Sequence, residues 1–352
     1  MMAEQVRQAD TTNGFVARLG GATLHHDDAL ACYADWEAPQ LIISDGPYGL
    51  GLFPGEAPTT NGIAESYAPH VAAWAKHALP GASLWFWNSE VGWAMVHATL
   101  ELHGWQYEEA SVWDKGIQHI AGNVNSKSIR GIPVVTELAV RYSRKATLPG
   151  PGGIHLAIKD WLRAEWRRSG LPMHQSNSAC GVKNAATRKY LTECHLWYFP
   201  PGEAIEAMAD WCSRHGRPLA LGERPYFSID GASSPSQAAW ERLRSKWTHT
   251  HGVTNVWAEP PVNGDERVRL GSGRKALHAN QKPLRLMERQ ILSTTDPGDV
   301  VWEPFGGLCS GAVAALRHER RVYAAELDAT YFEASKLRLA REIAAPCLKF
   351  AA

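Results

Sequence analysis

The stretch from Asp299 to Glu326 constrains the fold of this chain more than any other part of it. Asp299-Val300-Val301-Trp302 predicts a buried strand, an Ala-rich segment from about Ser310 to Arg317 predicts a helix, and Arg321-Val322-Tyr323-Ala324-Ala325 predicts a second strand. Strand, helix and strand at this spacing form a βαβ unit, in which a crossover helix joins two parallel strands. The sequence therefore predicts an α/β fold with a mostly parallel sheet.

Other apolar runs extend this sheet pattern, and one region interrupts it. Further strands are expected at 40–43, 83–87 and 134–142. The Gly- and Pro-rich run 148–153 marks a boundary, after which residues from about 154 to 247 are predicted to be helical and rich in Arg and Trp. We therefore expect a catalytic domain built from residues 1–150 and 253–352, with a helical module inserted at 151–252.

Composition excludes several classes of protein. The 352 residues carry no formal net charge, so any nucleic-acid-binding surface must be local. The six cysteines are scattered without a CxxC pair, and neither His25-His26 nor Cys194-His195 has metal-ligand partners at a useful spacing. No apolar window is long enough for a membrane span, and the polar segment Met1–Thr12 does not resemble a signal peptide. We expect no metal, no membrane and a reducing cytoplasmic location.

A Gly-rich turn joins the first strand of the βαβ unit to its helix. Glu303-Pro304-Phe305-Gly306-Gly307 offers small residues that let a ligand approach the backbone, and it leads into a helix N-terminus with free N–H groups. About 20 residues further on, Glu326 ends the next strand, where an acid typically accepts hydrogen bonds from ribose hydroxyls. A tight packing turn would explain the glycines alone; together with Glu326 they indicate a nucleoside-containing cofactor.

Asp45-Gly46-Pro47-Tyr48 follows the strand at 40–43, at the strand end where open α/β sheets bind ligands. The lone pair of an exocyclic base amine is delocalised into the ring, which makes the amine a poor nucleophile. A carboxylate and a backbone carbonyl that accept its two N–H bonds would localise that lone pair, and an aromatic ring would stack on the base. Asp45, the turn and Tyr48 could supply all three, although the same residues also suit a plain β-turn.

A series of motifs, taken in order, resembles the β group of amino DNA methyltransferases, in which the catalytic motif precedes the cofactor motif. Asp45–Tyr48 is similar to that group's Asp-Pro-Pro-Tyr, and the cofactor motif lies at 301–310. The other matching segments are Leu24–Leu30 with Asp28 at its acidic position, Val112–Lys115, Thr136–Ser143, Asn255–Trp257, His278–Pro283, and Glu326–Asp328.

The resemblance implies a Rossmann-like SAM-methyltransferase sheet with one antiparallel strand, and S-adenosyl-L-methionine (SAM) as the cofactor. Catalysis would fall to Asp45, Gly46, Pro47 and Tyr48. The cofactor would be held by Asp28, Asp45, Lys282, Phe305, Gly306, Gly307 and Glu326. The family also implies a bacterial or phage-encoded enzyme of the cytoplasm, and its members are often homodimers.

Three positions depart from the usual family motifs. Gly46 replaces the first proline of the catalytic motif, which predicts a less rigid turn. Glu303 replaces the leading aspartate of the cofactor motif, and Cys309 replaces its last glycine. These changes could alter the affinity or the pose of SAM, but the acidic and aromatic positions of both motifs are intact.

The inserted module lies where the family keeps its target-recognition region. Between residues 159 and 191 seven cationic residues face only Asp160 and Glu165. Met173–Ala179, a Cys180-Gly181-Val182 turn and Lys183–Leu191 predict a helix-turn-helix, although helical hairpins with a Gly turn are also common without DNA. Double-stranded DNA is the expected partner, with the contacts made by Lys183, Asn184, Arg188 and Lys189.

Asp at the first motif position favours N6 of adenine, whereas Ser in the family leans towards cytosine; N4 of cytosine stays the alternative product. The target base must be flipped out of the duplex to reach Asp45. A non-catalytic DNA-binding regulator on a methylase scaffold, or an RNA or protein-amine methyltransferase, would be compatible with parts of the same pattern.

Overall fold

The computed structural model describes residues 15–49, 62–119, 131–271, 273 and 275–344. The Met1–Thr12 segment, for which no signal peptide is predicted, and Cys347 lie outside these residues. The described chain divides into two compact units, one formed by residues 1–144 and 246–352 and the other by Lys145–Ser245. The second unit thus begins six residues before, and ends seven residues before, the 151–252 module expected from the sequence.

The first unit is built on one sheet, whose described strands follow the order β1-β2-β11-β10-β3-β4-β6-β5-β9. Its strands are β1 (Phe15–Leu19), β2 (Ala22–His26), β3 (Leu41–Ser44), β4 (Ser83–Asn88), β5 (Trp105–Asp114), β6 (Thr136–Arg144), β9 (Val256–Ala258), β10 (Val300–Glu303) and β11 (Arg321–Ala325). Of these, β1 and β6 run against the others. The single antiparallel strand expected from the resemblance is β6; the hairpin partner β1 was not predicted.

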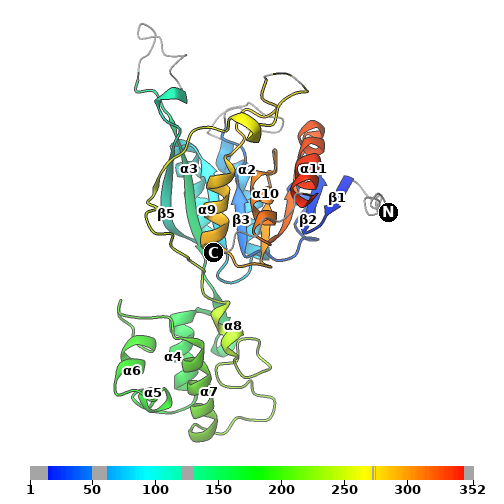
Figure 1. Ribbon diagram of the computed structural model, residues 1–352. Coiled ribbons are helices and arrows are strands. Elements are labelled where there is room, and N and C mark those ends of the chain that lie inside the picture. The colour runs from blue at the N-terminus through cyan, green and yellow to red at the C-terminus, as the bar shows by residue number, and fades with distance from the viewer. Residues whose placement is uncertain (1–14, 50–61, 120–130, 272, 274, 345–352) are drawn as a thin grey trace. The chain divides into compact units, whose positions relative to one another are not determined.

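Helices cover both faces of this sheet (Figure 1). They are α1 (Ala29–Cys32), α2 (Ile63–His77), α3 (Glu90–Leu102), α9 (Leu284–Thr294), α10 (Ser310–Arg317) and α11 (Ala329–Ala344), with short 3-10 turns at Ile117–His119 and Gly264–Glu266. Alternate strand residues serve the two faces because side chains alternate along a strand. Leu41, Ile43 and Val301 pack with α9–α11, whereas Ile42 and Trp302 pack with α1–α3.

The parallel strands β3 and β10 are neighbours, with Val301 opposite Leu41 and Trp302 opposite Ile42. The chain leaves β3 through α2 on one face and leaves β10 through α10 on the other. Helices that leave adjacent parallel strands on opposite faces open a crevice at the carboxyl ends of those strands, where open α/β sheets bind ligands. Asp45 follows β3 and Pro304 follows β10, so both sequence motifs meet at this point.

The second unit is mainly helical and has its own core. It contains α4 (Ile158–Arg168), α5 (Gln175–Ala179), α6 (Ala185–Tyr190), α7 (Gly202–His215) and α8 (Gln237–Glu241). Its core includes Trp161, Trp166 and Trp240, so these tryptophans serve packing. The sequence predicted no strand here, but β7 (Thr147–Pro149) and β8 (His155–Ala157) pair as a hairpin around a 3-10 turn at Pro151–Gly153. The Gly-rich run at 148–153 is therefore the turn of this hairpin, entered from within β7.

Candidate active site

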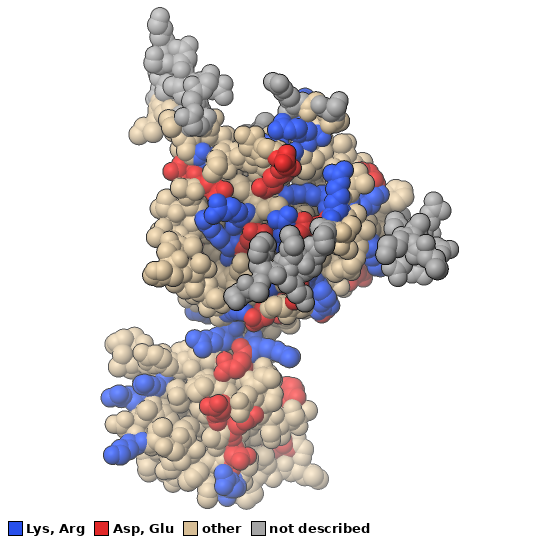
Figure 2. Space-filling model, viewed as in Figure 1, with Lys and Arg blue, Asp and Glu red and all other residues tan. Residues whose placement is uncertain are grey.

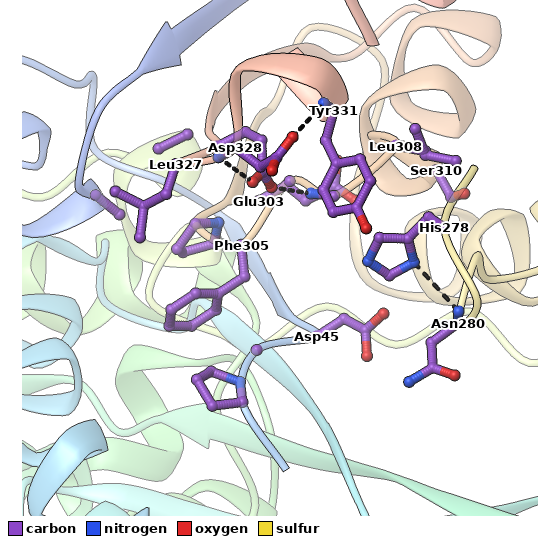
Figure 3. Close-up of a pocket in the computed structure, with 18 of the residues that line it drawn as sticks. Asp45, His278, Asn280, Glu303, Phe305, Leu308, Ser310, Leu327, Asp328 and Tyr331 are labelled. Atoms are coloured by element: carbon purple, nitrogen blue, oxygen red, sulfur yellow. Dashed lines mark hydrogen bonds between the residues drawn. The ribbon is translucent and has the colours of Figure 1, made fainter. Parts of the chain in front are cut away.

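A cavity of about 310 Å³ lies at the crevice between β3 and β10. This volume is at the lower end of the range of about 300–1,000 Å³ that is typical of small-molecule sites. Every residue expected to serve catalysis or the cofactor lines it: Asp28, Asp45, Gly46, Pro47, Tyr48, Lys282, Phe305, Gly306, Gly307 and Glu326. In Figure 3 the carboxylate of Asp45 points to the side on which His278 and Asn280 lie. The fold thus brings two motifs that are more than 250 residues apart in the sequence to one cavity.

The carboxylate of Asp45 is held through one of its two oxygens. Its Oδ1 lies 2.6 Å from Nζ of Lys282 and 3.1 Å from the hydroxyl of Tyr48. Among the residues that the structure describes, no hydrogen bond reaches Oδ2. Since an ionised carboxylate accepts through both oxygens, Oδ2 keeps its full capacity for a ligand.

Four charged side chains form a network around the Tyr48 hydroxyl. Lys282 Nζ lies 3.3 Å from Glu137 Oε2, and Lys115 Nζ lies 2.5 Å from Glu137 Oε1. The Tyr48 hydroxyl lies 3.1 Å from Glu137 Oε2 as well as from Asp45. Only 3% of the Lys282 side chain and 10% of the Glu137 side chain are exposed. Two cations therefore neutralise Asp45 and Glu137 where water is largely excluded.

The network sets the charge state of its members. Burial alone would raise the pKa of Glu137, but Lys282 and Lys115 outweigh it and lower that pKa. Burial would likewise lower the pKa of Lys282, but Asp45 and Glu137 outweigh it and raise that pKa. Burial, followed by Asp45 and Glu137, raises the pKa of the Tyr48 phenol well above its usual value. Near neutral pH, Glu137 and Lys282 are therefore charged, and Tyr48 is a neutral donor.

The backbone turn at Gly46 and Pro47 is fixed from two sides. Nδ2 of Asn88 and the hydroxyl of Tyr67 donate to the Pro47 carbonyl, at 3.0 and 3.2 Å. In the described part of the chain no hydrogen bond reaches the carbonyl of Gly46, which remains available to a ligand. A Cβ at Gly46 would lie 2.5 Å from Phe305 Cδ2 and 2.6 Å from the Tyr67 hydroxyl. Glycine therefore provides room for two rings, and hydrogen bonds supply rigidity that the sequence did not predict.

The Gly-rich turn after β10 contacts the acid after β11. The Gly307 N–H donates to Glu326 Oε2 at 2.6 Å, and the Asp328 N–H donates to Oε1 at 2.7 Å. A Cβ at Gly306 would lie 3.0 Å from the Ala325 carbonyl oxygen, and Gly307 has a φ of +52°, so both positions favour glycine. Burial raises the pKa of Glu326. Each of its oxygens still has a lone pair free for a hydroxyl.

Of the two departures in the cofactor motif, Glu303 lines the cavity and also caps a helix, whereas Cys309 lies in the core. The Glu303 carboxylate accepts from the backbone N–H groups of Gly311 and Ala312, at 2.8 and 2.7 Å, in the first turn of α10. Burial raises its pKa to about 7. Cys309 is fully buried in the core under α10, with φ +52° and ψ +47°, and it does not line the cavity. The conformation is left-handed, so the glycine requirement of the motif persists in the backbone although the residue has changed.

Sequence reasoning missed several residues of the cavity and its network. Glu137 and Lys115 were read only as parts of strand motifs; a charged side chain within an apolar strand was the signal available. Asp27, whose Oδ1 accepts from the Asp28 N–H at 2.7 Å, also lines the cavity. Further lining residues without an assigned role are Tyr67, His70, His278 and Tyr331, of which His278 and Tyr331 have ring centroids 4.8 Å apart.

The predicted helix-turn-helix exists only as two short helices, α5 and α6, joined through Gly181 at φ +66°. Lys183, Asn184 and Arg188 are exposed. Lys183 and Arg188 form no ion pair with any described residue. Lys189 lies with Nζ 5.3 Å from the Tyr198 ring centroid. The expected DNA-contacting side chains are therefore near one another on the surface of this unit.

The wider basic patch is smaller than the sequence suggested. Arg163 and Arg167 both pair with Glu193, which lies just beyond the counted window. Arg168 pairs with Glu165 and Glu223, and Lys159 donates to two backbone carbonyls. In Figure 2 several basic side chains of this unit lie at the edge where Figure 1 places α6. The count of seven cations against two anions was wrong as a measure of free charge.

Two absences concern the described residues alone. In the ranges given above, no group of three or more His, Cys, Asp or Glu side chains could hold a metal ion. Within the same ranges, no helix is both long and apolar enough to cross a membrane.

Comparison with known proteins identifies the family. A family model described as DNA methylase, for N6 and N4 methylation, matches residues 40–337. The chain is 36% identical over 89 residues to the type II methyltransferase M.HinfI of Haemophilus influenzae; the matched segment covers 25% of this chain and 24% of that protein. It is 31% identical over 93 residues to the DNA adenine methyltransferase YhdJ of Escherichia coli (strain K12); the matched segment covers 26% of this chain and 30% of that protein.

Among solved structures, the chain is similar to PvuII DNA methyltransferase, described as cytosine-N4-specific, with a TM-score of 0.49, 12% identity, and coverage of 92% of this chain and 91% of that one. The curated relatives are matched over less than a third of their length. The family model, by contrast, spans both the catalytic and the Gly-rich motif, and the cavity joins the two in space. The chain belongs to the N6/N4 family of DNA methylases.

Proposed function

We propose that this protein is a SAM-dependent DNA methyltransferase that methylates N6 of adenine. The observation that supports this most is that one cavity, at the β3–β10 crevice, is lined by both sequence motifs. Asp45 and the free Gly46 carbonyl form one wall, and Phe305–Gly307 with Glu326 form the other. A methyl donor and an acceptor amine must meet in one site, and this cavity offers a set of groups for each.

The residues of the second wall fit SAM, the methyl donor that this family uses. Glu326 would accept hydrogen bonds from the ribose hydroxyls, and the backbone at Gly306 and Gly307 leaves room for close approach. Asp28 lines the same cavity, and one of its oxygens already caps α1 through the Leu30 N–H at 2.9 Å. When bound, SAM supplies an electrophilic methyl group.

Lys282 has a different role in this proposal from the cofactor contact that the resemblance implied. An ammonium has three donors, and Asp45, Glu137 and the Tyr48 oxygen lie within 3.3 Å of its Nζ. Its positive charge lies against the Asp45 carboxylate, and its position orients that carboxylate. We therefore regard Lys282 as a positioning residue for Asp45.

The first wall would activate the amine. Asp45 Oδ2 and the Gly46 carbonyl accept its two N–H bonds and so restore nucleophilic character to the nitrogen. Charge-assisted hydrogen bonds are roughly twice as strong as neutral ones, which favours an ionised acceptor. Oδ2 can also take the proton that the amine loses. Tyr48 donates its hydroxyl proton to the carboxylates, while its ring remains at the cavity wall.

The choice of adenine rests on Asp45 at the first motif position, and the name of the relative YhdJ agrees with it. The same acceptors would serve N4 of cytosine, which remains the second candidate. The deciding experiment is mass spectrometry of nucleosides from DNA that has been incubated with the protein and SAM. N6-methyladenine is expected; N4-methylcytosine alone would refute the base assignment. No methylated base with any DNA, together with no SAM binding, would favour the non-catalytic regulator.

Double-stranded DNA would be recognised by Lys183, Asn184, Arg188 and Lys189. One base-edge contact is worth about 1–3 kcal/mol of discrimination. Arg188→Ala combined with Asn184→Ala should therefore reduce sequence preference in a methylation assay on mixed DNA while SAM affinity stays unchanged. If the double variant methylates the same sites with the same preference, recognition lies elsewhere.

Homodimer formation remains a prediction, which sedimentation can test.

A further inference from the structure

A chain of three buried side chains ends at the cavity wall. The indole Nε1 of Trp74 lies 2.8 Å from the Tyr33 hydroxyl oxygen, which in turn lies 2.8 Å from Nδ1 of His70. Trp74 and His70 stand one turn apart on α2, and Tyr33 follows α1 directly. At most 9% of each residue is exposed, so water does not compete for these bonds.

The chain of hydrogen bonds fixes which nitrogen of His70 carries the proton. An indole N–H can only donate, so the Tyr33 oxygen accepts from Trp74. The single hydroxyl proton of Tyr33 then has one described acceptor, the Nδ1 of His70. Burial lowers the pKa of His70 to about 4, so the ring is neutral at physiological pH. A neutral imidazole that accepts at Nδ1 carries its proton on Nε2.

The Nε2–H group faces no acceptor in the described part of the chain. Nε2 forms no hydrogen bond with a described residue. It is also not one of the side-chain polar atoms that are both fully buried and without a hydrogen-bond partner. His70 lines the cavity, and its ring centroid lies 4.8 Å from that of Phe305 in the cofactor motif. A donor left unsatisfied on ligand binding opposes that binding, so a ligand that offers no acceptor here would bind weakly.

We propose that His70 is a cofactor-contacting residue that donates a hydrogen bond from Nε2 to the adenine ring of SAM, with Tyr33 and Trp74 fixing its tautomer. This inference rests on the proposed function. Phe305, Tyr67 and His70 form an aromatic wall, which suits a flat purine, and a purine ring nitrogen accepts a neutral donor. Asp28 in the same cavity offers a carboxylate to the adjacent amino group. A donor beside an acceptor is complementary to the amino edge of adenine.

The first test observes the tautomer in the free protein. In NMR spectra of the full chain with ¹⁵N-labelled histidine, His70 should show the proton on Nε2, and Tyr33→Phe should give a mixture of tautomers. His77→Gln, at the far end of the same helix, serves as the assignment control. A His70 ring protonated on Nδ1 in the wild type would overturn the hydrogen-bond direction and with it the proposal.

The second test measures SAM affinity by calorimetry without DNA, so that no contact to a target base contributes. His70→Leu should weaken binding about tenfold, as expected for one lost buried hydrogen bond. His70→Gln, whose amide can donate from a similar place, should recover most of that loss. The matched control His77→Gln should bind as the wild type does.

A third measurement identifies the atom. For the wild type, SAM analogues with a carbon in place of one adenine ring nitrogen should include one that binds about tenfold more weakly. With His70→Leu this penalty should disappear. If all such analogues bind alike, or if His70→Leu binds SAM as the wild type does, the inference fails while the proposed function stands. If the wild type itself does not bind SAM, the proposed function fails first.

Discussion

Glu137→Gln is the substitution that tests the charged network most directly. Glu137 belongs to neither the catalytic motif nor the cofactor motif, yet its carboxylate accepts from Lys115, Lys282 and the Tyr48 hydroxyl. Glutamine keeps the shape and one acceptor oxygen but removes the negative charge and adds an N–H donor. That donor must face Lys115 or the pair formed by Lys282 and Tyr48. The expected consequence is a shift of Lys282 and Tyr48 relative to Asp45.

The size of the effect follows from the bonds that change. A hydrogen bond to a charged group contributes about 1.5–3 kcal/mol, so loss of one that orients Asp45 in the transition state corresponds to about a 10- to 150-fold fall in kcat. Glu137 does not line the cavity, and SAM affinity should therefore change by less than about twofold, well under the 1.4 kcal/mol that a tenfold change requires. Loss of kcat with retained SAM binding is the signature of a positioning residue.

The same variant has a predictable dependence of stability on pH. The pKa of Glu137 is lowered in the folded protein, so its contribution is complete above its unfolded pKa of about 4.3 and is lost as the pH falls through the folded value. Breaking a buried pair costs about 3–5 kcal/mol, and partial exposure of Lys115 reduces this. The difference in unfolding free energy between wild type and Glu137→Gln should therefore be largest near pH 7 and shrink below about pH 4.3.

The assays are steady-state kinetics of methyl transfer to unmethylated DNA, SAM calorimetry and urea unfolding at several pH values. Glu109→Gln is the matched control. Glu109 also pairs with a cation on the neighbouring strand, Arg141, but its side chain is 35% exposed and it is not a member of the network around Asp45. It should leave kcat unchanged. If Glu137→Gln turns over at the wild-type rate while Asp45→Asn is inactive, the network is structural, and the reasoning about position is refuted.

Three further substitutions test the walls of the cavity. Gly46→Ala places a Cβ against Phe305 and Tyr67, so it should cost about 1–3 kcal/mol of stability and displace the carbonyl of the catalytic motif. The control is Gly131→Ala, whose Cβ would meet nothing within 4 Å, and it should change neither unfolding nor turnover. Glu326→Ala should weaken SAM binding by about 1.5–3 kcal/mol in calorimetry, with exposed Glu333→Ala as the control, and an unchanged affinity would contradict the ribose role. Cys309→Gly should change the unfolding free energy by less than about 1 kcal/mol and leave SAM affinity unaltered, since relief of left-handed strain offsets the loss of a buried thiol.

The local parts of the fold were predictable because each is decided by neighbouring residues. The helix at Ser310–Arg317 and the strand at Arg321–Ala325 have the boundaries that periodicity predicts. The hairpin strands β7 and β8 were missed, since three residues each around a Gly-rich turn carry almost no alternation. The place of β10 between β11 and β3 depends on pairing across more than 250 residues, and no local pattern specifies it.

The site shows the same division. Asp45–Tyr48 and Phe305–Gly307 could be located because each motif is contiguous. Glu137, Lys115 and His70 could not be assigned, since their importance arises from contacts with residues 22 to 145 positions away in the sequence. The basic patch failed for a related reason: a window ending at residue 191 cannot include Glu193, which pairs with Arg163 and Arg167.

The departures from the family motif and the buried network together bear on whether the scaffold is still an enzyme. Cys309 faces the core, and Glu303 lines the cavity with its carboxylate bound to the first turn of α10, so neither change removes Asp45, the Gly46 carbonyl or Glu326 from the cavity. The network around Asp45 is a different matter. A buried ion cluster contributes little net stability, because the desolvation of its charges offsets their attraction. A scaffold that only bound DNA would gain nothing from keeping Lys282 and Glu137 beside a cavity. Charged groups with shifted pKa values gather at functional sites, and here they hold Oδ1 of Asp45, the carboxylate whose other oxygen accepts from the substrate amine in the proposed function.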